Sequence, residues 1–210
     1  MEGLVWIHNN WHGNVLVNQF FKGVTMLGDG AIIWLVLAGI LLFFKKTRVP
    51  AVVMLVSLVV GFVFNDLLLK NLIERARPYE TCGVFSEFIK GLGMELEASK
   101  SFPSGHTYSS FNCAVILTLF NKKSGFVLLP LATLIAFSRI FLCFHYPTDV
   151  LAGLVLGVVT AVVVFCLVIH KYTKKLNMLL SDLRKLSRKW QDVELTTHAH
   201  LQYRSLRHRW

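Results

Sequence analysis

The sequence predicts an all-α protein: a polytopic membrane bundle of about five transmembrane helices, with an interfacial helix before it and a basic amphipathic helix after it. Two observations predict this class. Of the 210 residues, 54% are hydrophobic and 16% are charged, which is too apolar for a soluble domain of this length. The apolar residues also gather in long windows, and no repeat divides the chain. One compact bundle is therefore expected.

Three windows have the length that about 30 Å of hydrocarbon requires, namely residues 50–69, 125–144 and 150–169. Two shorter windows, residues 31–44 and 107–120, hold 14 residues each and need a neighbouring polar turn to complete a span inside the bundle. The sequence therefore predicts five spans.

The two ends of the chain have a different composition. Residues 4–20 mix apolar residues at helical spacing with two tryptophans and several polar side chains, which is typical of an interfacial helix. Residues 171–210 contain ten Lys or Arg against three Asp or Glu, with leucines at helical spacing, as in a helix that lies on anionic lipid. We expect a membrane-embedded domain over residues 1–170 and a basic cytoplasmic tail over residues 171–210. Nothing beyond charge favours a nucleic-acid partner.

Basic residues orient the spans. Residues 45–48 join the first two spans, residues 122–123 join the third and fourth, and the tail follows the fifth. These clusters share one side of the membrane, which the positive-inside rule makes cytoplasmic. The extracytoplasmic face then carries residues 70–106 and the turn at residues 145–149.

The first polar block on that face is Lys70 and Arg77, followed by Pro78, at the end of the second span. Two neighbouring cations suit a polyanionic ligand. Each cation alone could equally be a snorkelling anchor at a helix end.

The second block, Pro103-Ser104-Gly105-His106, opens the third span. Glycine lets backbone N–H groups approach a ligand, serine adds a hydroxyl, and a helix N-terminus has unpaired N–H groups and a positive dipole end. Such a turn suits a phosphate. The same residues are also ordinary helix-start chemistry, with Ser104 as a cap.

The third block joins Arg139, near the outer end of the fourth span, to His145 and Asp149. An arginine in an apolar span is costly without an anion or carbonyl partner. Asp149 follows His145 by four residues, so on a helical turn it could accept the Nδ1–H and leave Nε2 as a nucleophile. A His/Asp pair that only caps the fifth span is the alternative.

The three blocks supply complementary roles on one face. Phosphoryl transfer needs neutralisation of the equatorial oxygens, an in-line nucleophile and a proton for the leaving oxygen. Lys70, Arg77 and Arg139 can supply the charge. His145 can supply the nucleophile and His106 the proton.

The blocks also match a known pattern. KX6RP, PSGH and SRX5HX3D occur in order with the right spacing, so the chain resembles the type-2 phosphatidic acid phosphatase family over residues 70–149. The matching residues are Lys70, Arg77 and Pro78, then Pro103, Ser104, Gly105 and His106, then Ser138, Arg139, His145 and Asp149.

The resemblance implies a lipid phosphatase without metal or cofactor. His145 would attack phosphorus to form a phosphohistidine, Asp149 would orient it, and His106 would protonate the departing oxygen. The phosphoryl oxygens would be held by a set of five residues: Lys70, Arg77, Ser104, Gly105 and Arg139.

Undecaprenyl diphosphate is the first expectation for the substrate, with phosphatidic acid or phosphatidylglycerophosphate behind it. Three alternatives stay open: a lipid phosphotransferase, a vanadium haloperoxidase, whose soluble members share the constellation, and a non-enzymatic anion transporter. Membrane lipids are the other expected partners.

Weaker signals concern single residues. Asp66 precedes Lys70 by four residues and is expected to position it. Asp29, in a Gly-Asp-Gly turn, is expected to cap the first span rather than reach the site. His8 and His12 lack a carboxylate or cysteine to complete a metal site, and the four cysteines are expected to be packing residues.

Overall fold

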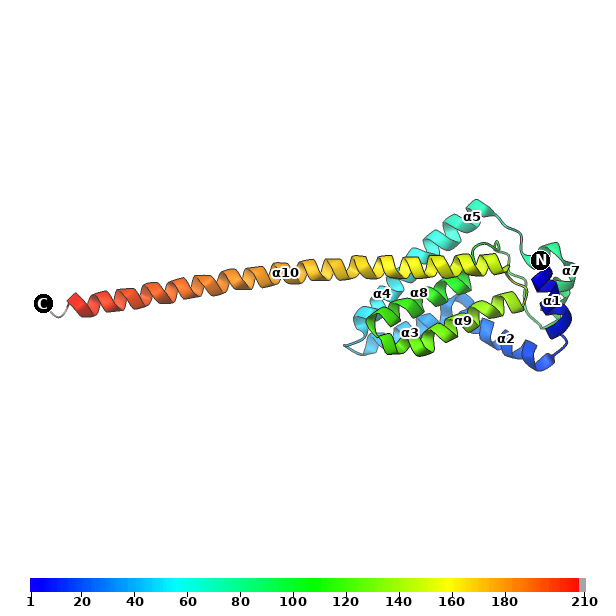
Figure 1. The fold of residues 1–210 in the computed structure, drawn as a ribbon, viewed down its shortest axis with the longest axis horizontal. Helices are drawn as coiled ribbons and strands as arrows, with labels where there is room; N and C mark the ends of the chain where they lie inside the picture. The colour runs from blue at the N-terminus through cyan, green and yellow to red at the C-terminus, as the bar shows by residue number, and fades with distance from the viewer. Residues whose placement is uncertain (208–210) are drawn as a thin grey trace. The chain divides into compact units, whose positions relative to one another are not determined.

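The computed structural model describes residues 1–207, and every regular element in that range is helical (Figure 1). The all-α prediction is therefore confirmed. The elements along the chain are α1 (Glu2–Trp11), α2 (Val15–Gly28), the 3-10 turn η1 (Asp29–Ala31), α3 (Ile32–Phe43), α4 (Arg48–Gly61), the π-helix η2 (Phe62–Leu69), α5 (Lys70–Ile73), α6 (Pro78–Thr81), α7 (Gly83–Gly91), α8 (Gly105–Phe120), the 3-10 turn η3 (Lys122–Ser124), α9 (Gly125–Phe141) and α10 (Pro147–Arg207).

Four helical stretches in the described part of the chain are long and apolar enough to cross a membrane: Val15–Phe43, Arg48–Thr81, Lys122–Phe141 and Pro147–Lys185. These stretches overlap four of the five predicted windows. The remaining window lies in α8, which has 16 residues, ten of them buried. A helix this short and this enclosed belongs to the interior of the bundle, so the membrane bundle is confirmed with α8 at its centre.

The N-terminal helix differs from the prediction. Residues 4–20 are not one helix, because α1 ends before His12 and a new helix starts after Asn14. The Asn14 side chain accepts the N–H groups of Leu16 and Val17, a cap that satisfies donors at the start of α2. The segment from α2 to α3 then bends at η1, where Gly30 and Ala31 have φ of 55° and 57°.

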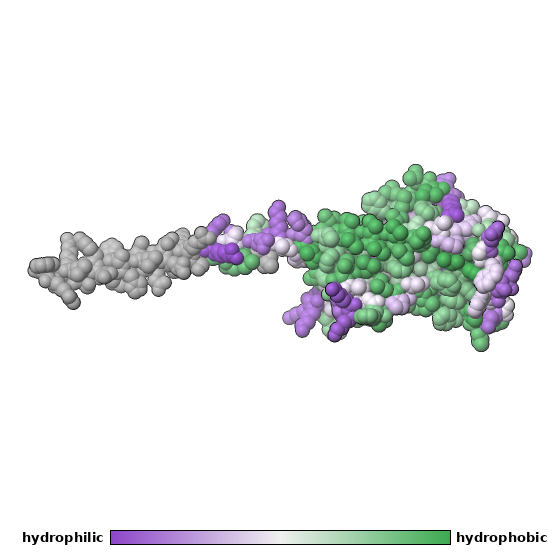
Figure 2. Space-filling view, viewed as in Figure 1, coloured by the Kyte–Doolittle hydropathy of each residue, from purple (hydrophilic) through white to green (hydrophobic). Residues whose placement is uncertain are grey.

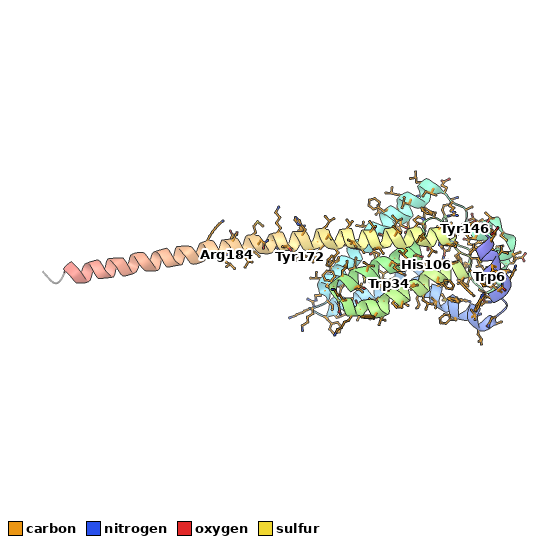
Figure 3. The ribbon with its side chains drawn as sticks, viewed as in Figure 1. Trp6, Trp34, His106, Tyr146, Tyr172 and Arg184 are labelled. Carbon is orange, nitrogen blue, oxygen red and sulfur yellow. The ribbon has the colours of Figure 1, made fainter. Side chains whose placement is uncertain are left out.

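Close backbone contact fixes α8 against the first part of α10. A Cβ added at Gly153 would lie 2.6 Å from the carbonyl oxygen of Ser104, and one at Gly157 would lie 2.6 Å from that of Tyr108. Side chains other than hydrogen are therefore excluded at both positions. On another face of α8, the Trp34 Nε1–H donates to Ser110 Oγ at 3.1 Å. Figure 3 labels Trp34, which lies in the bundle.

The surface of the bundle suits a bilayer. Apolar side chains cover most of its visible face, and hydrophilic side chains gather toward the ends of the helices (Figure 2). The α3–α4 and α8–α9 connections lie at one end, and α7 and the α9–α10 connection lie at the other (Figure 1). The two basic connections are thus separated from the elements that carry the polar blocks.

The chain divides into two units, Met1–Phe165 and Cys166–Trp210. The predicted division at residues 170 and 171 stays a prediction. Residues 171–207 are helical, as expected, and belong to the same helix, α10, as the fifth span. The side chains of residues 186–210 lie outside the described ones, and with them the amphipathic face expected for the end of the tail.

Candidate active site

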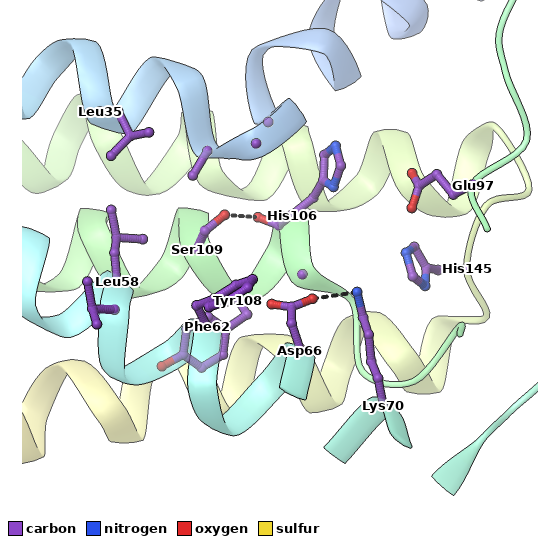
Figure 4. A pocket seen from close by; sticks show the side chains of 15 residues that line it. Leu35, Leu58, Phe62, Asp66, Lys70, Glu97, His106, Tyr108, Ser109 and His145 are labelled. Atoms are coloured by element: carbon purple, nitrogen blue, oxygen red, sulfur yellow. Dashed lines mark hydrogen bonds and ion pairs between the residues drawn. The ribbon is translucent and has the colours of Figure 1, made fainter. Parts of the chain in front are cut away.

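The polar blocks meet at a cavity of about 490 Å³ inside the bundle (Figure 4). One part of its wall is polar, with Lys70, His106 and His145 among the lining residues. Another part is apolar and comes from α3 and α4, including Leu35 and Leu58. The cavity therefore joins a cationic and histidine-rich centre to a hydrocarbon-lined space.

His145 reaches this cavity from the turn after α9. Cys143 adopts a left-handed conformation with φ of 58°, and the His145 N–H then donates back to the Arg139 carbonyl at 3.1 Å. This turn brings His145 and Arg139 to the same place. The His145 side chain is buried, and its Nε2 lies 3.3 Å from Arg77 Nη1. Burial lowers the pKa of His145 to about 3, which the two arginines reinforce and Asp149 opposes, so the ring is neutral at physiological pH.

Asp149 sits behind His145, as predicted, but the direct hydrogen bond is not formed. The distance from His145 Nδ1 to Asp149 Oδ2 is 3.7 Å, longer than a hydrogen bond. Ser101 contacts both groups, because its hydroxyl donates to Asp149 Oδ2 at 2.5 Å and lies 3.5 Å from His145 Nδ1. The Tyr146 N–H also donates to Asp149 Oδ2 at 3.0 Å. The pair is therefore part of a network that includes a serine that the motifs did not identify.

Arg75 is a second residue that the sequence analysis missed. Its Nη1 lies 2.6 Å from Asp149 Oδ1 and 2.7 Å from Thr148 Oγ1, and its guanidinium covers the Tyr146 ring at 4.1 Å. Asp149 is thus held as an ion by a cation outside the recognised pattern. The sequence could have indicated Arg75, because it lies two residues before Arg77 on the same polar face.

Arg77 and Arg139 are both buried and share one partner, Glu97. Arg77 Nη2 donates to Glu97 Oε2 at 2.6 Å, and Arg139 Nη2 donates to Glu97 Oε1. Arg139 Nη1 also donates to Thr25 Oγ1 at 2.8 Å, whereas its buried Nε has no protein acceptor among the described residues. A buried donor without a protein acceptor is a group that an anionic ligand could satisfy.

Glu97 belongs to the segment between α7 and α8. Burial would raise the pKa of its carboxyl, but the guanidiniums of Arg139 and Arg77 outweigh burial and hold that pKa below its usual range. Glu97 is therefore an ionised carboxylate next to the cavity. Sequence reasoning did not find it, although an excess of buried cations on one face implies an anionic partner.

The remaining phosphate-binding candidates lie at the start of α8. Lys70 pairs with Asp66 at 2.5 Å, as predicted, and a Cβ added at Gly105 would lie 3.7 Å from Lys70 Nζ. Ser104 is at the N-cap position, but its hydroxyl caps nothing and instead accepts from Thr107 Oγ1 at 3.0 Å. The lysine thus faces the first N–H groups of α8.

The prediction for Asp29 was wrong. Ala31, not Asp29, is the N-cap of α3, and no side chain caps that helix. Asp29 Oδ1 instead lies 2.7 Å from His106 Nε2, in the site. The Gly-Asp-Gly pattern gave a local explanation, while the true partner lies 77 residues further along the chain.

His8 and His12 contact each other through their Nδ1 atoms at 2.8 Å, and His12 Nε2 lies 2.7 Å from the Phe141 carbonyl. Among the side chains that the structure describes, no group of three or more His, Cys, Asp or Glu is arranged to hold a metal ion. The His12 ring also stacks on the Phe88 ring with the ring centroids 3.7 Å apart, so this histidine packs against α7.

The fold and this centre define a multi-pass helical membrane protein in which two histidines and a lysine line one cavity, and two buried arginines contact Glu97, which also lines it. Residues 50–172 match the PAP2 superfamily, and the chain belongs to this family. The family that the three motifs predicted is confirmed.

Several named proteins are similar to this chain. The bacitracin transport permease protein BcrC of Bacillus licheniformis is 34% identical over 130 residues, which cover 60% of this chain and 62% of the relative. An undecaprenyl-diphosphatase of Sulfolobus acidocaldarius is 30% identical over 60% of this chain and 58% of the relative. The chain thus spans about 60% of the length of these relatives.

A solved structure has a similar fold. The crystal structure of a PAP2-type phosphatidylglycerolphosphate phosphatase from Bacillus subtilis aligns with a TM-score of 0.58 and 27% identity, over 77% of this chain and 79% of the other. The helical membrane architecture is therefore common to both proteins.

Proposed function

We propose that the protein is a lipid phosphatase that works without metal and transfers a phosphoryl group to His145. The observation that carries this proposal is the pair of buried guanidiniums of Arg77 and Arg139, joined by one carboxylate beside His145 Nε2. The Glu97 carboxylate makes the hydrogen bonds that two phosphoryl oxygens would make. A phosphate at that position would lie next to the nucleophile.

The reaction has two steps. In the first, the Nε2 lone pair of His145 attacks phosphorus, the bond from phosphorus to the leaving oxygen breaks, and His106 gives that oxygen a proton. In the second, water attacks the phosphohistidine and returns a proton to His106, the phosphorus–nitrogen bond breaks, and inorganic phosphate leaves. Asp149 stabilises the charge that develops on His145.

Five residues hold the phosphoryl oxygens in this proposal. Arg77 and Arg139 offer guanidinium N–H groups, and Lys70 offers its ammonium group. Ser104 and the Gly105 N–H act from the start of α8, where the helix dipole favours an anion. Charge neutralisation by fixed groups in a buried site is the main catalytic term for such a reaction.

The apolar wall of the cavity favours a lipid substrate whose chain lies between α3 and α4. Undecaprenyl diphosphate is the preferred substrate, and the undecaprenyl-diphosphatase among the relatives supports this preference. Phosphatidylglycerophosphate and phosphatidic acid are the competing substrates. A panel of prenyl diphosphates and glycerolipid phosphates, compared by kcat/KM, separates them.

The active site is proposed to face the extracytoplasmic side, with the C-terminus in the cytoplasm. The basic residues in the α3–α4 and α8–α9 connections support this orientation through the positive-inside rule. Labelling of Ser86→Cys and Lys174→Cys variants from outside intact cells tests it. A variant at Ser86 that reacts only after lysis would overturn the orientation.

The decisive experiment measures phosphate release by purified protein in detergent with a chelator present. His145→Ala should reduce turnover to background and abolish the phosphoenzyme, because it removes the nitrogen that attacks phosphorus in the proposed mechanism. His170→Ala, at an exposed histidine of α10, is the matched control and should keep full activity. Turnover by His145→Ala at the wild-type rate would disprove the mechanism.

A further inference from the structure

Asp29 and His106 form a second His–carboxylate pair in the site, separate from that of His145 and Asp149. The Asp29 carboxylate lies 2.7 Å from His106 Nε2. Among the described residues, the side chain of Asp29 is hydrogen-bonded to His106, and α3, the helix that follows Asp29, has no side-chain cap. The carboxylate is therefore not explained by local helix chemistry.

The backbone next to Asp29 also fits the ring of His106. A Cβ added at Gly28 would lie 2.5 Å from His106 Cδ2 and 2.9 Å from Ile135 Cγ2. A glycine at this position lets the α2–η1 segment contact the imidazole edge. The ring is thus held by a carboxylate on one nitrogen and by backbone on one edge.

The contact leaves the other nitrogen for chemistry. His106 lines the cavity together with His145 and Lys70 (Figure 4), and its Nδ1 has no hydrogen-bond partner among the described residues. Burial and Arg139 disfavour the protonated form of the ring, whereas Asp29 and Glu97 favour it, and neither Arg139 nor Glu97 is hydrogen-bonded to the ring. Asp29 is the charged group within hydrogen-bond distance.

We infer that Asp29 is a positioning residue: it fixes the His106 ring through Nε2 and stabilises the imidazolium whose Nδ1–H is given to the leaving oxygen. This rests on the proposed role of His106 as the proton donor. As the bond from phosphorus to the leaving oxygen breaks, the Nδ1 proton moves to that oxygen, and Nε2–H stays bonded to Asp29. Water returns the proton in the second step.

The inference adds a residue outside the recognised pattern. Asp29 precedes residues 50–172, which match the family, and it lies before all three sequence blocks. Thr25, which accepts from Arg139 Nη1 at 2.8 Å, comes from the same N-terminal segment. The α2–η1 segment therefore supplies contacts to two site residues.

The test uses leaving groups of different basicity, because a proton donor matters most when the leaving group is a strong base. A prenyl monophosphate must expel an alkoxide, whereas the diphosphate of the same prenyl chain expels a phosphate, which is far less basic. Measuring kcat/KM for both substrates, with full-length protein in detergent, isolates the step in which the leaving group departs.

For Asp29→Asn we expect kcat/KM for the monophosphate to fall on the order of 10- to 100-fold, a part of the full effect of a general acid. The diphosphate should lose only about twofold, because its leaving group needs little protonation. Asp29→Glu, which keeps the charge, should restore much of the monophosphate activity. Asp182→Asn, at an exposed carboxylate of α10, is the matched control and should change neither substrate.

The outcomes separate the two proposals. His106→Gln should show the same substrate dependence as Asp29→Asn, only stronger, and Asp29→Asn added to His106→Gln should cost nothing more. A uniform loss on both substrates in Asp29→Asn, or no loss, would overturn the role of Asp29 while leaving the phosphatase intact. A uniform loss in His106→Gln would overturn the proton-donor role itself, and with it the inference.

Discussion

The carboxylate of Glu97 lies 2.6 Å from Nη2 of Arg77, and its second oxygen contacts Arg139. One residue of a connecting segment thus neutralises two buried guanidiniums. In the proposed mechanism a phosphoryl group would use the same donors, so we expect substrate to displace this carboxylate when it binds. The two arginines would then pair with Glu97 in the ligand-free site and with phosphate in the occupied site, so Glu97 and phosphate would compete for the same hydrogen-bond donors.

The first prediction concerns this competition. Glu97→Gln should lower the thermal stability of the ligand-free protein, because buried guanidiniums left without a charged partner cost about 1–3 kcal/mol or more. Inorganic phosphate or vanadate should then raise the melting temperature of the variant more than that of the wild type. Thermal unfolding in detergent, with and without the anion, measures both effects.

Glu95→Gln is the matched control for Glu97→Gln, since Glu95 is an exposed carboxylate two residues away. It should behave as wild type in both conditions. An equal anion response in the wild type and in Glu97→Gln would show that the carboxylate and the anion do not compete.

The second prediction concerns Ser101. Its hydroxyl donates to Asp149 Oδ2 at 2.5 Å and contacts His145 Nδ1, so Ser101→Ala removes the group between the proposed nucleophile and its carboxylate. A hydrogen bond to a charged group is worth about 1.5–3 kcal/mol, and its loss should lower kcat about 10- to 100-fold. KM should change little. Ser86→Ala, at a half-buried serine of α7 whose hydroxyl donates to the Gly83 carbonyl, should leave kcat unchanged.

The third prediction tests the contact between α8 and α10. Gly157→Ala would drive a methyl group to 2.6 Å from the Tyr108 carbonyl oxygen, so the two helices must separate. We expect a loss of about 1–3 kcal/mol of stability, as for other overpacked interiors. Gly39→Ala, where nothing lies within 4 Å, should be neutral. Equal melting temperatures for the two variants would contradict the helix packing.

The fourth prediction concerns pH. Burial lowers the pKa of His12 from 6.5 to about 4, against the opposing hydrogen bond to Phe141. Between about pH 6.5 and pH 4, His12 is protonated in the unfolded chain but neutral in the folded protein. The stability of the fold should therefore decrease as the pH is lowered through this range. His145 adds to the same slope.

His12→Gln can still donate to the Phe141 carbonyl but does not titrate, so its melting temperature should depend less on pH over this range. His170→Gln, at an exposed histidine, should keep the slope of the wild type. Melting curves from pH 7 to pH 4.5 give the comparison. Parallel curves for His12→Gln and wild type would exclude His12 as a source of the slope.

Periodicity and charge predicted the membrane bundle well, because hydropathy marks spans directly. The predicted windows were wrong about where some helices begin, as when a side-chain hydrogen bond sets the helix start. Asn14 divides the expected N-terminal helix by capping the start of α2, and α8 begins at Gly105 rather than at Thr107. Such ends depend on which donors find acceptors, and composition alone does not contain that information.

The site was predictable where residues recur at fixed spacing and not where they meet through the fold. Lys70, His106 and His145 line one cavity, as the blocks implied. Asp29 was wrongly assigned to a helix cap and Glu97 was not assigned at all, because each resembles an ordinary polar residue of a turn or connection. Their partners lie in other elements, and only the folded chain brings them within hydrogen-bond distance.

The Glu97 carboxylate also bears on the end of the catalytic cycle. A site made only of cations would bind inorganic phosphate tightly after hydrolysis and lose two buried charge partners when it departed. If Glu97 pairs again with Arg77 and Arg139 when the product leaves, both guanidiniums keep a charged partner. Under the proposed mechanism we therefore expect Glu97 to weaken substrate binding and to speed the release of phosphate.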